Sequence, residues 1–108
     1  MGDFYIFTIE LKKSLIDLAG NSYRKYTSQL LKDGTAFALK LQEDLKKWIE
    51  DYSIHEMTKE EFQSLVKSKK DLLEMEALKQ EGLAKTDINK LRNGIIEMVA
   101  ETAIKFLL

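Results

Sequence analysis

The feature that most constrains this chain is an apolar stripe that runs through residues 4–52 without a proline. Its members recur at a mean spacing of about 3.7 residues, which is the period of an α-helix and not the alternation of a strand. The stripe consists of Phe4, Phe7, Leu11, Leu15, Leu18, Ser22, Tyr26, Leu30, Asp33/Gly34, Phe37, Leu41, Leu45, Trp48 and Tyr52. This spacing predicts a long amphipathic helix.

Two glycines argue against an unbroken helix in this stretch. Gly20 is followed by Asn21-Ser22, a pattern typical of a helix end and a new N-cap, and Gly34 follows Asp33 in a turn-type dipeptide. A mid-helix glycine costs only ~1 kcal/mol relative to alanine, so packing can support a helix through either position. Because the stripe keeps its phase, we expect continuity through Gly20, and both readings stay open at Gly34.

A second helix is predicted over residues 59–81. Thr58 and Glu61 have the spacing of a capping box, in which each side chain binds a free backbone N–H of the other residue. Gly82, followed by the apolar Leu83, has the pattern of a Schellman stop. These start and stop signals bound the helix on both sides.

A third helix is predicted over residues 87–107, with Thr86 or Asp87 as its N-cap. Apolar residues occupy most of its circumference, so it must contact neighbours on two or three sides. Residues 1–108 are therefore predicted to form one all-α domain. In this three- or four-helix bundle, the long amphipathic first helix packs with a C-terminal helical hairpin.

The predicted lengths imply self-association. A hairpin of the last two helices is ~35 Å long and covers about half of an unbroken first helix. The other half would leave its apolar stripe and the neighbouring Ile9 and Ile16 in solvent, and this apolar surface is too large for a monomer. We therefore predict a homodimer, and a larger protein partner that contacts the aromatic residues after Gly20. The predicted interface residues are Phe4, Phe7, Leu11, Leu15, Leu18, Tyr23, Tyr26, Ile96 and Ile104.

Composition narrows the class of protein. The 17 Lys and Arg against 18 Asp and Glu give a net charge of −1, which argues against overall attraction to nucleic acid. The chain contains no cysteine, so disulfides and thiolate metal sites are excluded. No apolar run approaches the ~18 residues of a membrane span, so no membrane insertion is expected. The N-terminus lacks the basic region of a signal peptide, and we expect a cytoplasmic protein.

Three groups of residues are candidates for a chemical site. His55 is the only histidine, and it is read as a solvated loop residue because no partner that would orient it is evident. Glu97 and Glu101, one helical turn apart, could share a divalent cation but are read as a solvated helix face. The basic cluster Lys67 to Lys70 is read in the same way. No catalytic residue, metal site or cofactor is predicted.

Three functions are compatible with these observations. The preferred one is a non-enzymatic helical bundle that acts through self-association and protein–protein contacts. The alternative is an amphipathic coat or peripheral protein on a membrane or granule surface, with Lys12, Lys13, Arg24 and Lys25 at the interface. A small helical hydrolase that uses His55 is the least favoured, because glycine-rich phosphate loops, nucleophile elbows and zinc-ligand spacings are missing from the sequence.

Overall fold

A computed structural model describes residues 3–108, and this part of the chain is helical without any strand. The all-α prediction is confirmed, as is the packing of the first helix against the last. The elements in chain order are α1 (Phe4–Ala19), η1 (Arg24–Tyr26), α2 (Thr27–Lys40), α3 (Gln42–Ser53), α4 (Lys59–Ser68), η2 (Lys70–Leu72), α5 (Glu76–Lys79) and α6 (Lys85–Phe106).

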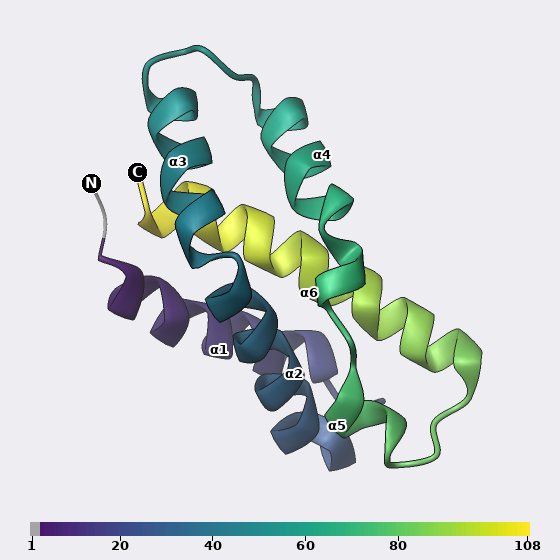
Figure 1. The fold of residues 1–108 in the computed structure, drawn as a ribbon. Helices are drawn as coiled ribbons and strands as arrows, with labels where there is room; N and C mark the ends of the chain where they lie inside the picture. Colours follow the sequence, from purple (N-terminus) through teal and green to yellow (C-terminus); the bar gives the residue numbers. More distant parts are fainter. Residues whose placement is uncertain (1–2) are drawn as a thin grey trace.

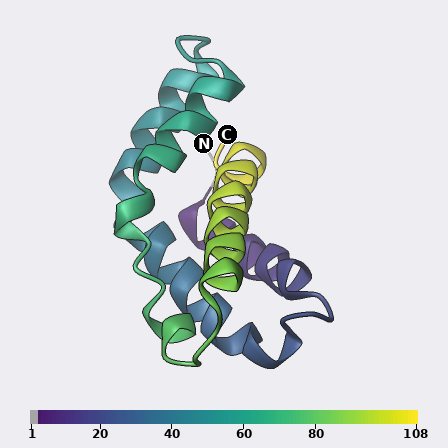
Figure 2. The ribbon, with the colours of Figure 1, turned by 90° about the vertical axis from the view of Figure 1, so that its right-hand side faces the viewer.

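The helices form two layers, which Figures 1 and 2 show from directions 90° apart. One layer contains α1 and α6, which run antiparallel, so that the start of α1 and the end of α6 lie at the same end of the molecule. The other contains the bent rod of α2 and α3, and α4 returns alongside α3. The molecule is elongated, with extents of 43 × 24 × 20 Å.

The C-terminal helix α6 is the centre of this arrangement. It contacts α1, α2, α3 and α4, as its nearly continuous apolar circumference predicts. The predicted bounds of 87–107 agree with the observed helix to within two residues. The predicted N-cap is wrong: Ala84 occupies that position without a side-chain hydrogen bond, and Asp87 instead binds a residue far away in the sequence.

The predicted continuity of the first helix through Gly20 is wrong. Helix α1 ends at Ala19, and Gly20 has φ +53°, a left-handed backbone conformation that glycine adopts without a steric penalty. The Gly20 N–H donates to the carbonyl of Ile16 at 3.2 Å, and the chain then turns so that α2 packs back on α1. The apolar spacing did not reveal this turn, because the apolar residues of α2 continue the helical spacing of the stripe in α1.

Gly34, in contrast, lies inside α2 and does not break it. A Cβ atom at this position would lie 2.5 Å from Leu15 Cδ1, so the missing side chain lets α1 and α2 approach closely. Gly94 has the same role in α6, where a Cβ would lie 2.7 Å from Leu18 Cδ1. Both glycines are therefore explained by helix packing and not by a turn.

Replacing Gly34 with alanine should have effects of opposite sign in two backgrounds. In the wild type the new methyl group meets the fully buried Leu15, and overpacking costs ~1–3 kcal/mol, which outweighs the ~1 kcal/mol gain in helix propensity. In a Leu15→Ala background the clash is gone, and Gly34→Ala should stabilise the protein by the ~1 kcal/mol of helix propensity alone. Urea unfolding of the four proteins measures both steps. Stabilisation by Gly34→Ala in both backgrounds would contradict the close-packing explanation.

The second predicted helix, 59–81, is correct at its ends and wrong in its middle. The Thr58–Glu61 capping box is present, and Gly82 ends the segment with φ +74°. Helix α4 nevertheless stops at Ser68, and the chain reaches the short α5 through Met75, which is buried with φ +58°. The sequence did not indicate this break, and the helix that follows it begins at a contact with α2.

That contact is made by Asp33, whose carboxylate is buried against the start of α5. Its two oxygens accept hydrogen bonds from the backbone N–H groups of Ala77 and Leu78, each at 2.9 Å. These are N–H groups in the first turn of a helix, which have no partner within that helix. Asp33 thus acts as an N-cap from a distant element and stabilises a new helix start within the predicted 59–81 helix.

Candidate interaction surface on α1

Helix α1 is apolar on two sides, and the inner side belongs to the core. Phe7, Leu11 and Leu15 are fully buried, and Ala19 is 2% exposed. The helix begins where the Asp3 carboxylate accepts a hydrogen bond from the Tyr5 N–H at 2.8 Å. The inner side packs against α2 and α6, so a single chain already covers it.

The opposite side of α1 carries four exposed apolar residues, which we call the outer face. Tyr5 is 69% exposed, Ile6 49%, Ile9 37% and Ile16 50%. Tyr5, Ile9 and Ile16 are separated by four and seven residues, which places them on one side of a helix. The outer face is an apolar patch that the single chain leaves in solvent.

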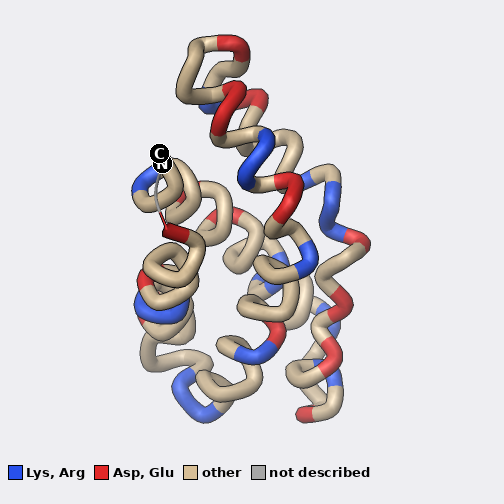
Figure 3. The backbone as a smooth tube through the Cα atoms, turned by 60° about the vertical axis from the view of Figure 1, so that its left-hand side comes forward, with Lys and Arg blue, Asp and Glu red and all other residues tan. Residues whose placement is uncertain are grey.

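Charged residues of both signs border the outer face. Lys12 and Lys13 are exposed between Ile9 and Ile16 in the sequence, and Glu10 and Asp17 lie on the same helix. Lys13 Nζ pairs with Glu10 Oε1 at 3.2 Å. Acidic and basic residues are interspersed along the helices of the molecule, as Figure 3 shows. The surroundings of the patch therefore attract neither a polyanion nor a polycation strongly.

The predicted interface residues lie mostly inside one chain. Phe7, Leu11, Leu15 and Ile96 are buried, whereas Phe4, Leu18, Tyr23, Tyr26 and Ile104 are half-buried and pack against the core. Their burial needs no second copy, because α2 folds back where an unbroken helix was expected. Ile9 and Ile16, which were expected to add to the uncovered apolar surface, do remain exposed.

Tyr23 has a partner within the chain. Its hydroxyl donates to Asp87 Oδ1 at 2.7 Å, and Lys90 Nζ lies 5.7 Å from the centre of its ring. The hydrogen bond to Asp87 raises the pKa of the Tyr23 hydroxyl, and desolvation and the negative charge of Asp87 act in the same direction. This contact fixes the turn after α1 to the start of α6. Tyr26 is half-buried beside Lys25, whose Nζ lies 5.8 Å from its ring.

His55 occupies the exposed loop between α3 and α4, with φ +64°. A shallow pocket beside it is lined by Tyr52, Met57, Thr58 and Lys59. These neighbours include no carboxylate that would orient the imidazole as a general base. The position of His55 is that of a residue that ends a helix.

The basic cluster Lys67 to Lys70 does not form one surface. Lys67 lines a groove between α4 and α6, whereas Lys70 lines the cleft beside Arg92. Lys69 Nζ lies 4.0 Å from Asp44 Oδ2. Glu97 and Glu101 line the α4–α6 groove opposite Glu60. Within residues 3–108, no three acidic or histidine side chains are placed to hold a metal ion.

The predicted interface residues include neither Tyr5 nor Ile6. The signal for Tyr5 was present: positions 5, 9 and 16 form a second apolar stripe on the opposite side of the helix from the first, interrupted by Lys12. A helix with two such stripes has apolar residues left over once one side is buried. None of the helices within residues 3–108 combines the length and the apolar character that crossing a bilayer requires.

Comparison with known proteins does not add to this description. No family model matches the chain, and searches of curated proteins and of solved structures find no significant match.

Proposed function

We propose that this protein is a non-enzymatic interaction module that self-associates through the outer face of α1. The observation that supports this most is the placement of Tyr5, Ile6, Ile9 and Ile16 in solvent on a helix whose other side is already in the core. Four exposed apolar side chains on one 16-residue helix form a patch of the kind that proteins use for association.

The other large apolar residues that are exposed do not form a comparable set. Leu39, Ile54, Leu72 and Leu108 belong to four different segments of the chain. Single apolar residues on a surface are normal and need no partner. The concentration of such residues on α1 is therefore the distinguishing feature.

A second copy of this chain is the favoured partner for chemical reasons. Two copies present the same patch, and a twofold axis can bury both at once. Each copy also carries both acidic and basic groups at the edge of the patch, namely Glu10, Lys12, Lys13 and Asp17, so an identical surface offers charges of the opposite sign. A larger protein with an apolar groove would use the same outer face.

Association through one helix face should be weak. A stable interface usually buries at least ~1,200 Å² in total, and a contact limited mainly to four side chains per copy falls at or below this range. Lys12 and Lys13 interrupt the apolar residues and must bend toward solvent. We therefore expect a reversible dimer with a dissociation constant in the micromolar range or above.

A double substitution on the outer face tests this function. Ile9→Glu combined with Ile16→Glu should abolish dimerisation, because it places four like charges in the contact while both side chains point to solvent in the folded monomer. Leu39→Glu is the control, since Leu39 is an exposed apolar residue on α2, outside the outer face. Sedimentation equilibrium at several concentrations measures the mass of all three proteins.

Loss of the dimer in the α1 variant but not in the Leu39 variant would support the proposal. Two outcomes would contradict it: a wild type that stays monomeric up to millimolar concentration, or a dimer that survives both glutamates. Circular dichroism on the same samples establishes that the variants are folded.

A peripheral role on an anionic lipid surface is the second candidate. It is favoured by exposed basic residues, Lys12 and Lys13 on α1 and Arg24 and Lys25 in η1, which could contact phosphate headgroups while the apolar residues enter the interface. Acidic residues on α1 and the net charge of −1 oppose it. Flotation with vesicles that contain anionic lipid tests this candidate. Protein that remains in the aqueous fraction at physiological salt would exclude it.

A further inference from the structure

A polar cleft lies between α6 and the segment that precedes it, away from the outer face of α1. Its volume is about 630 Å³, which suits a small molecule. One wall is the first half of α6, and the other is the chain from Lys70 to Lys79. The lining residues are Lys70, Asp71, Leu73, Glu74, Glu76, Lys79, Asn89, Arg92 and Asn93.

The α6 wall presents donors that suit an oxyanion. Arg92 and Asn93 follow Asn89 by three and four residues, so both lie beside Asn89 on the same side of the helix. Arg92 is half-buried as a residue, and its guanidinium makes an exposed hydrogen bond to Asn89 Oδ1 at 3.4 Å, which leaves its other N–H groups available to a ligand.

Within residues 3–108, none of the cations that line this cleft lies within 4.0 Å of a carboxylate oxygen. For residues 3–108, the only acidic groups within 4.0 Å of a lysine or arginine nitrogen belong to three pairs, and none of these includes Arg92, Lys70 or Lys79. An arginine guanidinium binds carboxylate and phosphate groups through parallel, charge-assisted hydrogen bonds. Arg92 is thus a recognition group without a protein ligand.

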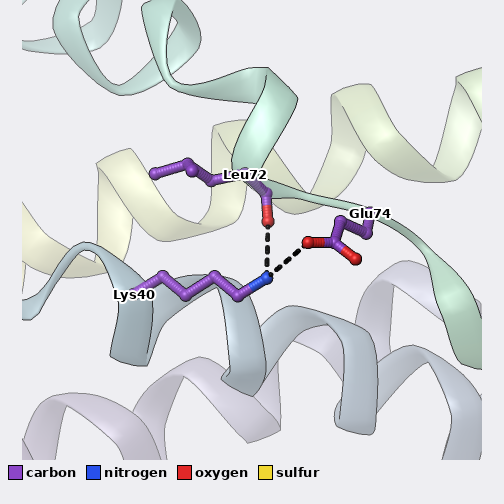
Figure 4. Close-up of polar contacts among 3 residues, drawn as sticks. All are labelled: Lys40, Leu72 and Glu74. Atoms are coloured by element: carbon purple, nitrogen blue, oxygen red, sulfur yellow. Dashed lines mark hydrogen bonds and ion pairs between the residues drawn. The ribbon is translucent and has the colours of Figure 1, made fainter.

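The opposite wall is held in place from its far side. Asp33 binds the backbone of α5, and Lys40 Nζ reaches from α2 to the carbonyl of Leu72 at 3.2 Å and to Glu74 Oε1 at 3.1 Å, as Figure 4 shows. These contacts fix the wall without using the donors that face the cleft. A ligand would therefore bind a wall that is already ordered, which reduces the entropic cost of binding.

The charge balance of the cleft allows an anion to bind. Three cations and three carboxylates line it, but Glu74 is paired with Lys40, which lies outside the cleft on α2. The hydrogen bond and charge of Lys40 lower the pKa of Glu74 and keep it ionised and paired. With Glu74 engaged by Lys40, two further carboxylates, Asp71 and Glu76, stand against the three cations of the lining.

From this geometry we propose that the cleft binds the oxyanion of a small ligand, a phosphate or carboxylate group, with Arg92 as its principal donor. Asn89 and Asn93 add amide donors from the same helix, and Lys70 and Lys79 contribute positive charge from the opposite wall. This site is separate from the outer face of α1 and does not depend on dimerisation.

The test is an NMR titration of the ¹⁵N-labelled full chain with inorganic phosphate and, separately, with acetate, at constant ionic strength set by chloride. Saturable shifts are expected for the side-chain N–H signals of Arg92, Asn89 and Asn93. Arg92→Gln should weaken the affinity at least tenfold, because it removes the charged, forked donor. Arg24→Gln is the matched control: it alters the other arginine of the chain, which is exposed in η1, and should leave the affinity unchanged.

A second variant guards against a folding effect at Arg92. Lys79 is exposed, so Lys79→Gln should leave the fold intact and weaken binding severalfold. Saturation with phosphate alone would assign a phosphoryl ligand, and saturation with acetate alone a carboxylate. Shifts that never saturate with either anion, or an affinity that is unchanged by Arg92→Gln, would overturn the proposal.

Discussion

Leu15→Glu is expected to unfold the protein in buffer at room temperature. Leu15 is fully buried where α1 approaches Gly34, and the substitution both removes its packing and places a carboxylate among apolar side chains. Together these effects cost about 5 kcal/mol or more, which is comparable to the whole stability of a small domain. Far-ultraviolet circular dichroism and urea unfolding measure the loss.

The neighbouring residue supplies the control. Ile16 is 50% exposed on the outer face, so Ile16→Glu should leave the helical signal and the unfolding midpoint close to those of the wild type. A folded Leu15→Glu protein would mean that the inner side of α1 is not core. In that case the prediction of an interface built on Phe7, Leu11 and Leu15 would regain its basis.

Asp33→Ala is expected to have the second largest effect. The buried carboxylate accepts two backbone hydrogen bonds from α5, and its removal leaves two donors without a partner. The expected loss is about 3 kcal/mol, since each bond involves a charged acceptor. Hydrogen exchange should locate the change, with the amides of Ala77 and Leu78 exchanging much faster than those in the centre of α6.

Asp33→Asn serves as the graded control for this prediction. Asparagine keeps one acceptor oxygen, so the loss of stability should be intermediate and exchange at Ala77 and Leu78 should rise less. If both variants were as stable as the wild type, the start of α5 would not depend on Asp33. The wall of the anion cleft would then need a different support.

The fold class was predictable because helical periodicity depends on local sequence. The capping box at Thr58, the stop at Gly82 and the multiply contacted last helix all follow from short patterns, and all are present. The errors have non-local causes. Gly34 resembles a turn residue but accommodates Leu15, whereas Gly20 looked tolerable but adopts a left-handed conformation that ends α1.

The break within 59–81 shows the same limit. Its own sequence is compatible with a helix, and the side chain that starts α5 belongs to Asp33, more than forty residues earlier. Thr86 or Asp87 was the predicted N-cap of the last helix, but the carboxylate of Asp87 accepts a hydrogen bond from the distant Tyr23. In both cases a polar side chain is engaged by an element that no local window contains.

The candidate surface was predicted in part. The predicted contact lay on the first helix, on the stripe that is now its inner side, because half of that stripe would be uncovered on an unbroken helix. Once α2 folds back, the inner stripe is buried and only the second stripe at Tyr5, Ile9 and Ile16 stays in solvent. The cleft at Arg92 was not predicted, since it requires the irregular segment between α4 and α6.

The most direct test of the central claim, a compact single chain that associates through α1, is the solution mass and shape of the wild type. Light scattering coupled to small-angle X-ray scattering over a concentration series measures both. At low concentration we expect a mass of 12.5 kDa and a shape with extents of 43 × 24 × 20 Å. At high concentration the mass should double. A long rod at every concentration would contradict the fold, and a constant monomer mass would contradict the association.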